Sequence, residues 1–140
     1  MYSAIELSKH IVTKCTTDNY PISNLQLQKI LYYIQKYYLV RNSIAFSDNI
    51  EAWQFGPVVP NVYYRFCGFG AMPITNTYDD TNISFEDAQI IDAIVEEKRA
   101  LDPWVMVEET HKKKGAWDQI YRNGLGNRDV IPCELIKKAG

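Results

Sequence analysis

The sequence has 140 residues, which suits one domain that buries roughly two thirds of its unfolded surface. Its formal net charge of −2 excludes a chain-wide positive field, so nucleic acid is not an expected partner. The three cysteines, Cys15, Cys67 and Cys133, form no closely spaced pair, which favours packed thiols in a reducing cytoplasm over a disulfide framework.

No segment of the sequence is expected to enter a membrane. The most apolar stretch, residues 30–40, is interrupted by Gln35 and Lys36 and has about half the length that a bilayer span requires. Glu6, Lys9 and His10 interrupt the apolar residues at the N-terminus, which therefore lacks the pattern of a signal peptide. We expect a cytoplasmic protein.

Two capping patterns predict the first two helices. Ser3 followed by Glu6 predicts a helix over residues 4–16, and Ser23 followed by Gln26 predicts a second one. The second helix carries an apolar stripe over three turns, with further apolar residues on both flanks, which is too wide for a surface helix. We expect it to be the central, most buried helix. The stripe consists of Leu27, Ile30, Leu31, Ile34 and Tyr38.

Residues 46–55 favour a short strand that leads into the stretch Gly56-Pro57-Val58-Val59-Pro60. We interpret this stretch as a stiff corner, after which Pro60 starts a third helix that ends near Gly68. Residues 70–82 are expected to form a loop or a weak extended segment.

The C-terminal half predicts shorter helices. A fourth helix follows Ser84, a fifth starts at Asp102-Pro103, a short amphipathic segment covers residues 117–121, and a last turn or two follows Pro132. The fold class is therefore mainly α (α+β). We expect residues 1–140 to form a single compact domain of about five to six helices around a central buried helix, with a small short-stranded β element.

The sequence shows no established catalytic, metal or cofactor pattern. The two histidines, His10 and His111, have no neighbouring nucleophile, and the scattered cysteines give zinc no short-range pair of ligands. The glycine pairs lack the lysine and the strand-to-helix context of a phosphate loop, and residues 112–114, three lysines, are read as hydrated cations at a helix end. We expect no cofactor and no metal. A site that uses Cys67 and His111 stays open as an alternative.

The corner allows two interpretations that can hold together. Trp53 and Phe55 can pack onto the second helix while Pro57 and Pro60 stiffen the chain, or the segment can present a rigid aromatic surface to a protein partner. We predict that Trp53→Ala costs about 3–5 kcal/mol through lost packing, unless Trp53 is an exposed contact.

Three segments resemble a known family. The stretches SNLQLQKILYYIQ (23–35), EAWQFGPVVPNVY (51–63) and THKKKGAW (110–117) are similar, in this order, to the SocA-like antitoxin family, or Panacea domain, whose members include phage-associated and GepA-like proteins. The resemblance implies a protein that neutralises a toxin by direct contact. It also implies, for at least one type, an adaptor that delivers its toxin to a Clp-type protease.

The resemblance assigns roles to particular positions. Its structural signature falls on Leu27, Lys29, Leu31 and Tyr32. Its partner-binding signature consists of Trp53, Gly56, Pro57, Val58, Pro60, Tyr63, His111 and Trp117. We add Phe55 to this set because of the aromatic composition of the corner. The chain departs from the family in ending at residues 137–140 instead of in a longer aromatic helix, and it carries no appended DNA-binding domain.

Three functions are weighed. The first is a non-enzymatic antitoxin that masks a toxin. The second is a phage or mobile-element inhibitor of a host defence protein such as a CRISPR nuclease, which would use the same kind of surface. The third is an enzyme that uses His111 or Cys67. The first is favoured because the family match comes without a catalytic set of residues.

Overall fold

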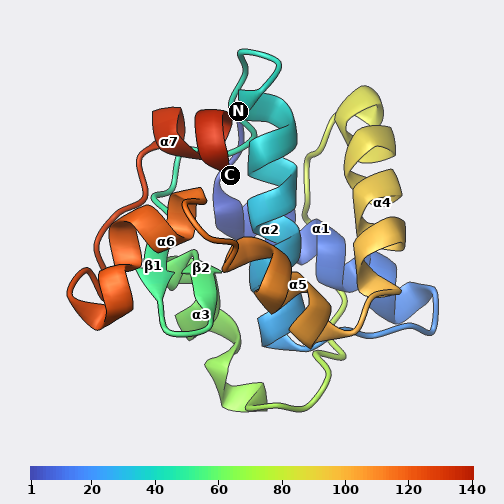
Figure 1. Ribbon diagram of the computed structural model, residues 1–140. Coiled ribbons are helices and arrows are strands. Elements are labelled where there is room, and N and C mark those ends of the chain that lie inside the picture. Colours follow the sequence, from blue (N-terminus) through green and yellow to red (C-terminus); the bar gives the residue numbers. More distant parts are fainter.

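The computed structural model describes residues 1–140, which form seven α-helices, two short 3-10 helices and one two-stranded sheet (Figure 1). The α-helices are α1 (Ala4–Thr17), α2 (Asn24–Leu39), α3 (Pro60–Phe66), α4 (Phe85–Arg99), α5 (Pro103–Thr110), α6 (Ala116–Tyr121) and α7 (Cys133–Ala139). The strands are β1 (Glu51–Trp53) and β2 (Gly56–Val58), and the 3-10 helices are η1 (Cys67–Phe69) and η2 (Arg122–Gly124). The mainly helical class with a small β element is confirmed. There are more helices than the expected five to six, because both short C-terminal segments close full helical turns. No helix combines the length and the apolar character needed to cross a bilayer.

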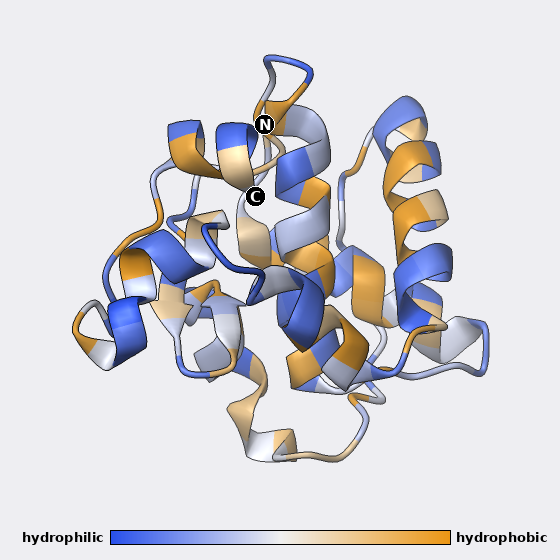
Figure 2. Ribbon diagram, in the orientation of Figure 1, coloured by the Kyte–Doolittle hydropathy of each residue, from blue (hydrophilic) through white to orange (hydrophobic).

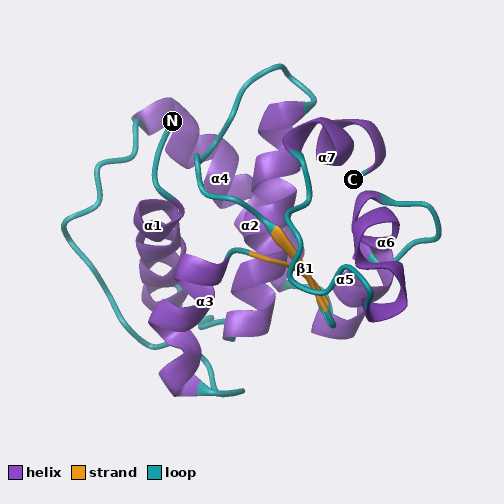
Figure 3. Ribbon diagram, turned by 90° about the vertical axis from the view of Figure 1, so that its left-hand side faces the viewer, coloured by secondary structure: helices purple, strands orange, loops and turns teal.

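Helix α2 is the centre of the fold, as the width of its apolar sector predicts. It starts with the predicted capping box, in which the Ser23 hydroxyl accepts from the backbone N–H of Gln26 and the Gln26 side chain accepts from the backbone N–H of Ser23. It contacts α1, α3, α4, α5, α7 and β2. Figures 1 and 3 show it surrounded by these elements, with α4 on one side and the β-hairpin on the other.

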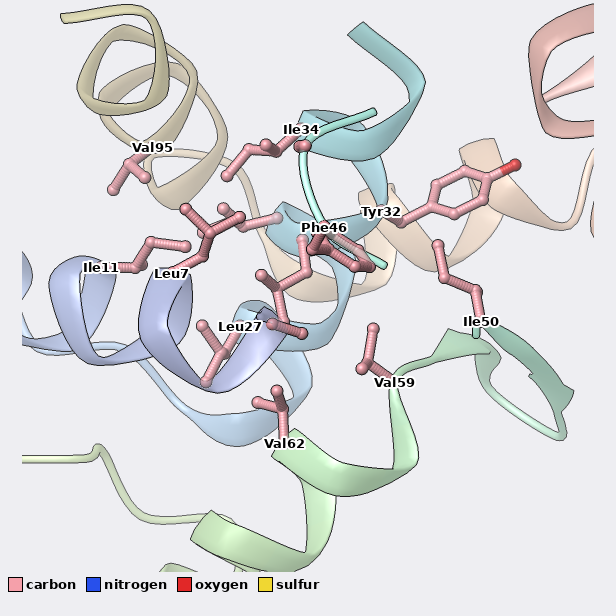
Figure 4. Close-up of a cluster of buried hydrophobic side chains, with 14 of the residues drawn as sticks. Leu7, Ile11, Leu27, Tyr32, Ile34, Phe46, Ile50, Val59, Val62 and Val95 are labelled. Atoms are coloured by element: carbon pink, nitrogen blue, oxygen red, sulfur yellow. The ribbon is translucent and has the colours of Figure 1, made fainter. Parts of the chain in front are cut away.

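The hydrophobic core is continuous around α2. Its buried side chains come from α1, α2, β1, α3, α4, α6 and α7 and from the segments between them. Figure 4 shows Leu7 of α1, Leu27 of α2, Val62 of α3 and Val95 of α4 directed toward one cluster. Burial of each such side chain contributes about 1.5–3 kcal/mol, so the core holds α2 in place from several sides. Figure 2 shows hydrophobic and hydrophilic residues mixed along α4, which lies at the edge of the molecule and covers the core with only one face.

The expected stiff corner is instead the second strand of a hairpin. Strands β1 and β2 are antiparallel, with Trp53 opposite Gly56 and Ala52 opposite Pro57. Pro57 has no N–H, yet no ladder bond is lost, because Ala52 uses its own N–H and carbonyl on the opposite side, with residues 128–129. Gly56 has φ +116°, a value that suits glycine, and Pro60 starts α3 as predicted.

Candidate functional site

Three polar residues on one face of α2 bind the backbone of the segment that contains β2 and the start of α3. Lys29 Nζ donates to the carbonyl oxygen of Pro57 at 3.4 Å, the Val59 N–H donates to Gln28 Oε1 at 2.8 Å, and Asn24 Nδ2 donates to the carbonyl oxygen of Tyr63 at 3.1 Å. Asn24, Gln28 and Lys29, here called the polar triad, are all buried. The triad therefore fixes the hairpin and α3 against α2, because buried backbone groups need partners.

Lys29 is a fully buried lysine without an acidic partner. Its side chain has no exposed surface, and none of the ion pairs of the protein includes it. Burial lowers the pKa of Lys29 from 10.5 to about 7. Gly56 lies against the ammonium group, since a Cβ at this position would be 2.6 Å from Nζ. The close packing of Lys29 thus depends on glycine at position 56.

Three stacked rings, here called the aromatic column, are hydrogen-bonded to β1 of the hairpin. His111 stacks on Trp117 with 3.6 Å between ring centroids, and Trp117 stacks on Tyr121 at 4.6 Å. Trp117 Nε1 donates to the carbonyl oxygen of Trp53 at 2.7 Å. His111 Nε2 is buried without a hydrogen-bond partner, and burial, followed by the nearby charge of Lys29, lowers the pKa of His111. The column links residues 111–121 to β1.

A cavity of about 550 Å³ lies where the N-terminal end of α2, the hairpin turn, the region of η1, the start of α5 and residues 121–128 meet. We call it the aromatic cavity. Its lining consists of Asn24, Leu25, Gln28, Lys29, Trp53, Gln54, Phe55, Val58, Tyr63, Cys67, Gly70, Ala71, Trp104, Tyr121, Asn127 and Arg128. This volume falls within the range of pockets that hold a small ligand or a large side chain, about 300–1,000 Å³.

The aromatic side chains of this cavity are partly exposed. Trp53 is half-buried and packs edge-on against Tyr63 at 4.9 Å, and the guanidinium of Arg128 lies 4.2 Å from the Trp53 ring centroid. Phe55 and Trp104, whose rings are 5.7 Å apart, are 50% and 56% exposed. For Phe55, this exposure favours the interpretation of a surface presented to a partner over packing onto the second helix. Phe55 lies in the two-residue turn of the hairpin, where its ring packs edge-on against Trp104 of α5.

The structure places the remaining predicted residues around the hairpin and the core. Trp53, Val58 and Tyr63 line the cavity with Phe55, whereas Gly56 and Pro57 are buried in β2. Trp117 donates to the Trp53 carbonyl of β1 and His111 stacks on Trp117, while Pro60 begins α3. Leu27, Leu31 and Tyr32 belong to the core, whereas Lys29 combines burial with a place in the cavity wall. Of the structural set only Lys29 lines the cavity, beside Trp53, Phe55, Val58 and Tyr63 of the partner-binding set.

Sequence reasoning missed several residues of the site. Asn24 and Gln28 carried a usable signal, since two polar residues four positions apart interrupt one face of an otherwise apolar helix. Trp104 and Arg128 carried none, because both lie far from the hairpin in sequence and reach it only through the fold.

The residues considered for catalysis or metal binding lie in different surroundings. Cys67 Sγ donates to the carbonyl oxygen of Tyr64, while the ring of His111 stacks on Trp117, so the two residues are engaged with different partners. His10 lies elsewhere, 2.7 Å from Asp92. Nowhere do three or more His, Cys, Asp or Glu side chains gather closely enough to hold a metal ion.

A helical domain that holds a rigid hairpin and an aromatic cavity on its surface fits a class of proteins that act by binding. The chain belongs to the family described as Antitoxin SocA-like, Panacea domain, whose model matches residues 27–118. It is 40% identical to Antitoxin SocA of Caulobacter vibrioides (strain NA1000 / CB15N) over 141 residues, which cover 91% of this chain and 74% of that protein. No solved structure matches the chain. The family resemblance of the three segments is thus confirmed.

Proposed function

We propose that this protein is an antitoxin that neutralises a cognate toxin protein by direct, stoichiometric contact. The observation that carries the proposal is the 40% identity to Antitoxin SocA over most of both chains. The mouth of the aromatic cavity is the proposed contact face, because Phe55 and Trp104 expose large aromatic surfaces there. Tryptophan and other aromatic residues dominate the energetics of many protein interfaces.

The polar triad supports this contact face. Side chains that hold the backbone of residues 57–63 leave the hairpin little freedom to lose when a partner docks. A preorganised surface binds more tightly than a flexible surface of the same area, because less conformational entropy is lost.

Co-expression tests the proposal. The product of the adjacent open reading frame is expressed alone and then with this protein in a heterologous host, and growth and complex formation by affinity purification are measured. We expect growth arrest, restored growth and a stable complex, with neutralisation complete when the two proteins are present in equal amounts. The proposal would be contradicted if co-expression restored no growth and the two proteins formed no complex.

The same cells separate the finer mechanisms. Direct masking leaves the amount of toxin unchanged, whereas delivery to a Clp-type protease lowers it in cells with the protease and not in cells without it. An inhibitor of a CRISPR nuclease would instead restore phage infection in nuclease-bearing cells and leave the toxin active.

A further inference from the structure

The lining of the aromatic cavity is one-sided in charge. The whole chain has 17 acidic and 15 basic residues, yet the 16 residues that line this cavity include Lys29 and Arg128 and no aspartate or glutamate. Because the low-dielectric walls of a cavity strengthen the field of its charged groups, the cavity is positive within an overall acidic protein.

The two cations of the cavity have neutral partners. Lys29 bonds to a backbone carbonyl, and Arg128 donates to the Tyr64 hydroxyl at 2.9 Å and lies over the Trp53 ring. Glu51, the carboxylate beside this group, accepts the Trp53 Nε1–H at 2.9 Å and is not part of the lining. Arg128 therefore has donors left for an incoming anion, since a guanidinium offers five N–H groups.

The walls of the cavity favour an apolar or aromatic group beside that anion. Nine of the 16 lining residues are hydrophobic, and Trp53, Phe55 and Trp104 give it ring faces and edges. A partner aromatic ring gains about 0.5–1.5 kcal/mol from such contacts beyond its area burial. Asn127 adds an amide group suited to peptide backbone, whereas the amides of Asn24 and Gln28 already bond within the protein.

We propose that the partner inserts an aromatic or large aliphatic side chain into the aromatic cavity, with an adjacent aspartate, glutamate or terminal carboxylate paired to Arg128. The partner segment is thus acidic and aromatic, and a basic segment is rejected by Arg128. This assignment rests on the proposed function and names the chemistry that the contact face selects.

A random peptide library panned on the immobilised protein tests this assignment without the toxin. We expect enriched peptides that place Phe, Tyr, Trp or Leu next to Asp or Glu. Their dissociation constants should rise at least about tenfold on Arg128→Glu and on Trp104→Ser, a loss of about 1.4 kcal/mol. Phe85→Ser is the matched control, because Phe85 is 77% exposed at the start of α4, on the far side of α2 (Figure 1). It should leave binding unchanged.

A charge exchange separates contact from a structural effect. A peptide whose Asp or Glu is replaced by Lys should lose binding to the wild type and regain it with Arg128→Glu, which a folding defect cannot produce. Three results would overturn the assignment. They are enrichment of basic peptides, enrichment on the wild type that is no greater than on Arg128→Glu, and equal binding of the peptides to all variants. Selective binding of AMP without peptide enrichment would also overturn it and would identify a nucleotide pocket.

The failure of this assignment differs from the failure of the proposed function. If the wild type rescues growth and both Arg128→Glu and Trp104→Ser rescue equally well, the antitoxin function stands and the cavity is not its contact face. If the peptides behave as expected but the wild type neither binds the toxin nor rescues growth, the cavity binds acidic aromatic segments and the antitoxin function is wrong.

Discussion

At the scale of single residues, the pair formed by Lys29 and Gly56 is the most tightly constrained part of the site. A buried ammonium group without a carboxylate is normally unfavourable, and here its pKa falls to about 7. The hairpin passes directly over it because residue 56 has no side chain. Each residue therefore limits what the other can be.

Replacement of Gly56 by alanine tests this constraint. The added Cβ would meet Lys29 Nζ at 2.6 Å on a backbone with φ +116°, so we expect a loss of about 1–3 kcal/mol in the free energy of unfolding. Gly68→Ala is the control, because a Cβ there meets nothing within 4 Å. Urea denaturation measures both; equal stability of the two variants would contradict the packing described.

Lys29 also predicts how stability depends on pH. Below pH 7 both the folded and the unfolded chain carry the proton, so the penalty of the buried charge is complete. Between about 7 and 10.5 the folded chain releases the proton and the unfolded chain keeps it, so stability rises with pH by up to about 1.4 kcal/mol per unit. Lys29→Met removes this rise. Denaturation of both proteins between about pH 6 and pH 9 checks it, and parallel curves would count against a depressed pKa.

The two tryptophans beside the hairpin differ in what their loss should cost. Trp117 is buried, stacks on two rings and donates to the Trp53 carbonyl, so we expect Trp117→Ala to cost about 3–5 kcal/mol. Trp53 is only half-buried, which corrects the sequence-based prediction: Trp53→Ala should cost less than about 3–5 kcal/mol. Thermal melts give the order, and a larger loss for Trp53 would contradict it.

At the scale of elements, the attachment of the hairpin to α2 is polar as well as hydrophobic. Gln28 supplies the acceptor for the buried Val59 N–H at the junction of β2 and α3. Such a bond orients the two elements, because it works in only one register, whereas apolar contacts tolerate sliding.

Gln28→Leu tests the importance of this attachment. The Val59 N–H would stay buried without a partner, so we expect a loss of about 1–3 kcal/mol. Gln89→Leu, at an exposed position of α4, makes the same chemical change and should stay within about 0.5 kcal/mol of the wild type. Hydrogen exchange of the Val59 amide gives a second readout; unchanged protection would show that the bond is dispensable.

At the scale of the whole molecule, the proposed contact face is assembled by the packing of the chain around α2. Its cations, Lys29 and Arg128, come from the central helix and from a loop near the C-terminus. The net charge of −2 conceals this local positive region, because the acidic residues lie outside the cavity lining.

The charge of the cavity predicts a salt-dependent association. Since exposed charges are screened within about 8 Å at physiological ionic strength, the association rate with the partner should fall as salt rises, and fall less for Arg128→Glu. Stopped-flow or surface-plasmon measurements at several salt concentrations check this. A rate independent of salt would argue against an acidic partner segment.

The sequence by itself determined where most elements begin, because capping is local. Ser3, Ser23, Ser84 and Asp102 each accept from a backbone N–H two or three residues later, and each starts a helix as expected. The wide apolar sector of α2 also determined its central position, since only full enclosure removes such a surface from water.

Only the tertiary structure decided that residues 51–58 form a hairpin with Phe55 exposed, and that Trp104 and Arg128 join the residues of α2 around one cavity. These features depend on contacts between residues up to a hundred positions apart. Their free energy is gained only once the chain is packed, so no short stretch of sequence contains it.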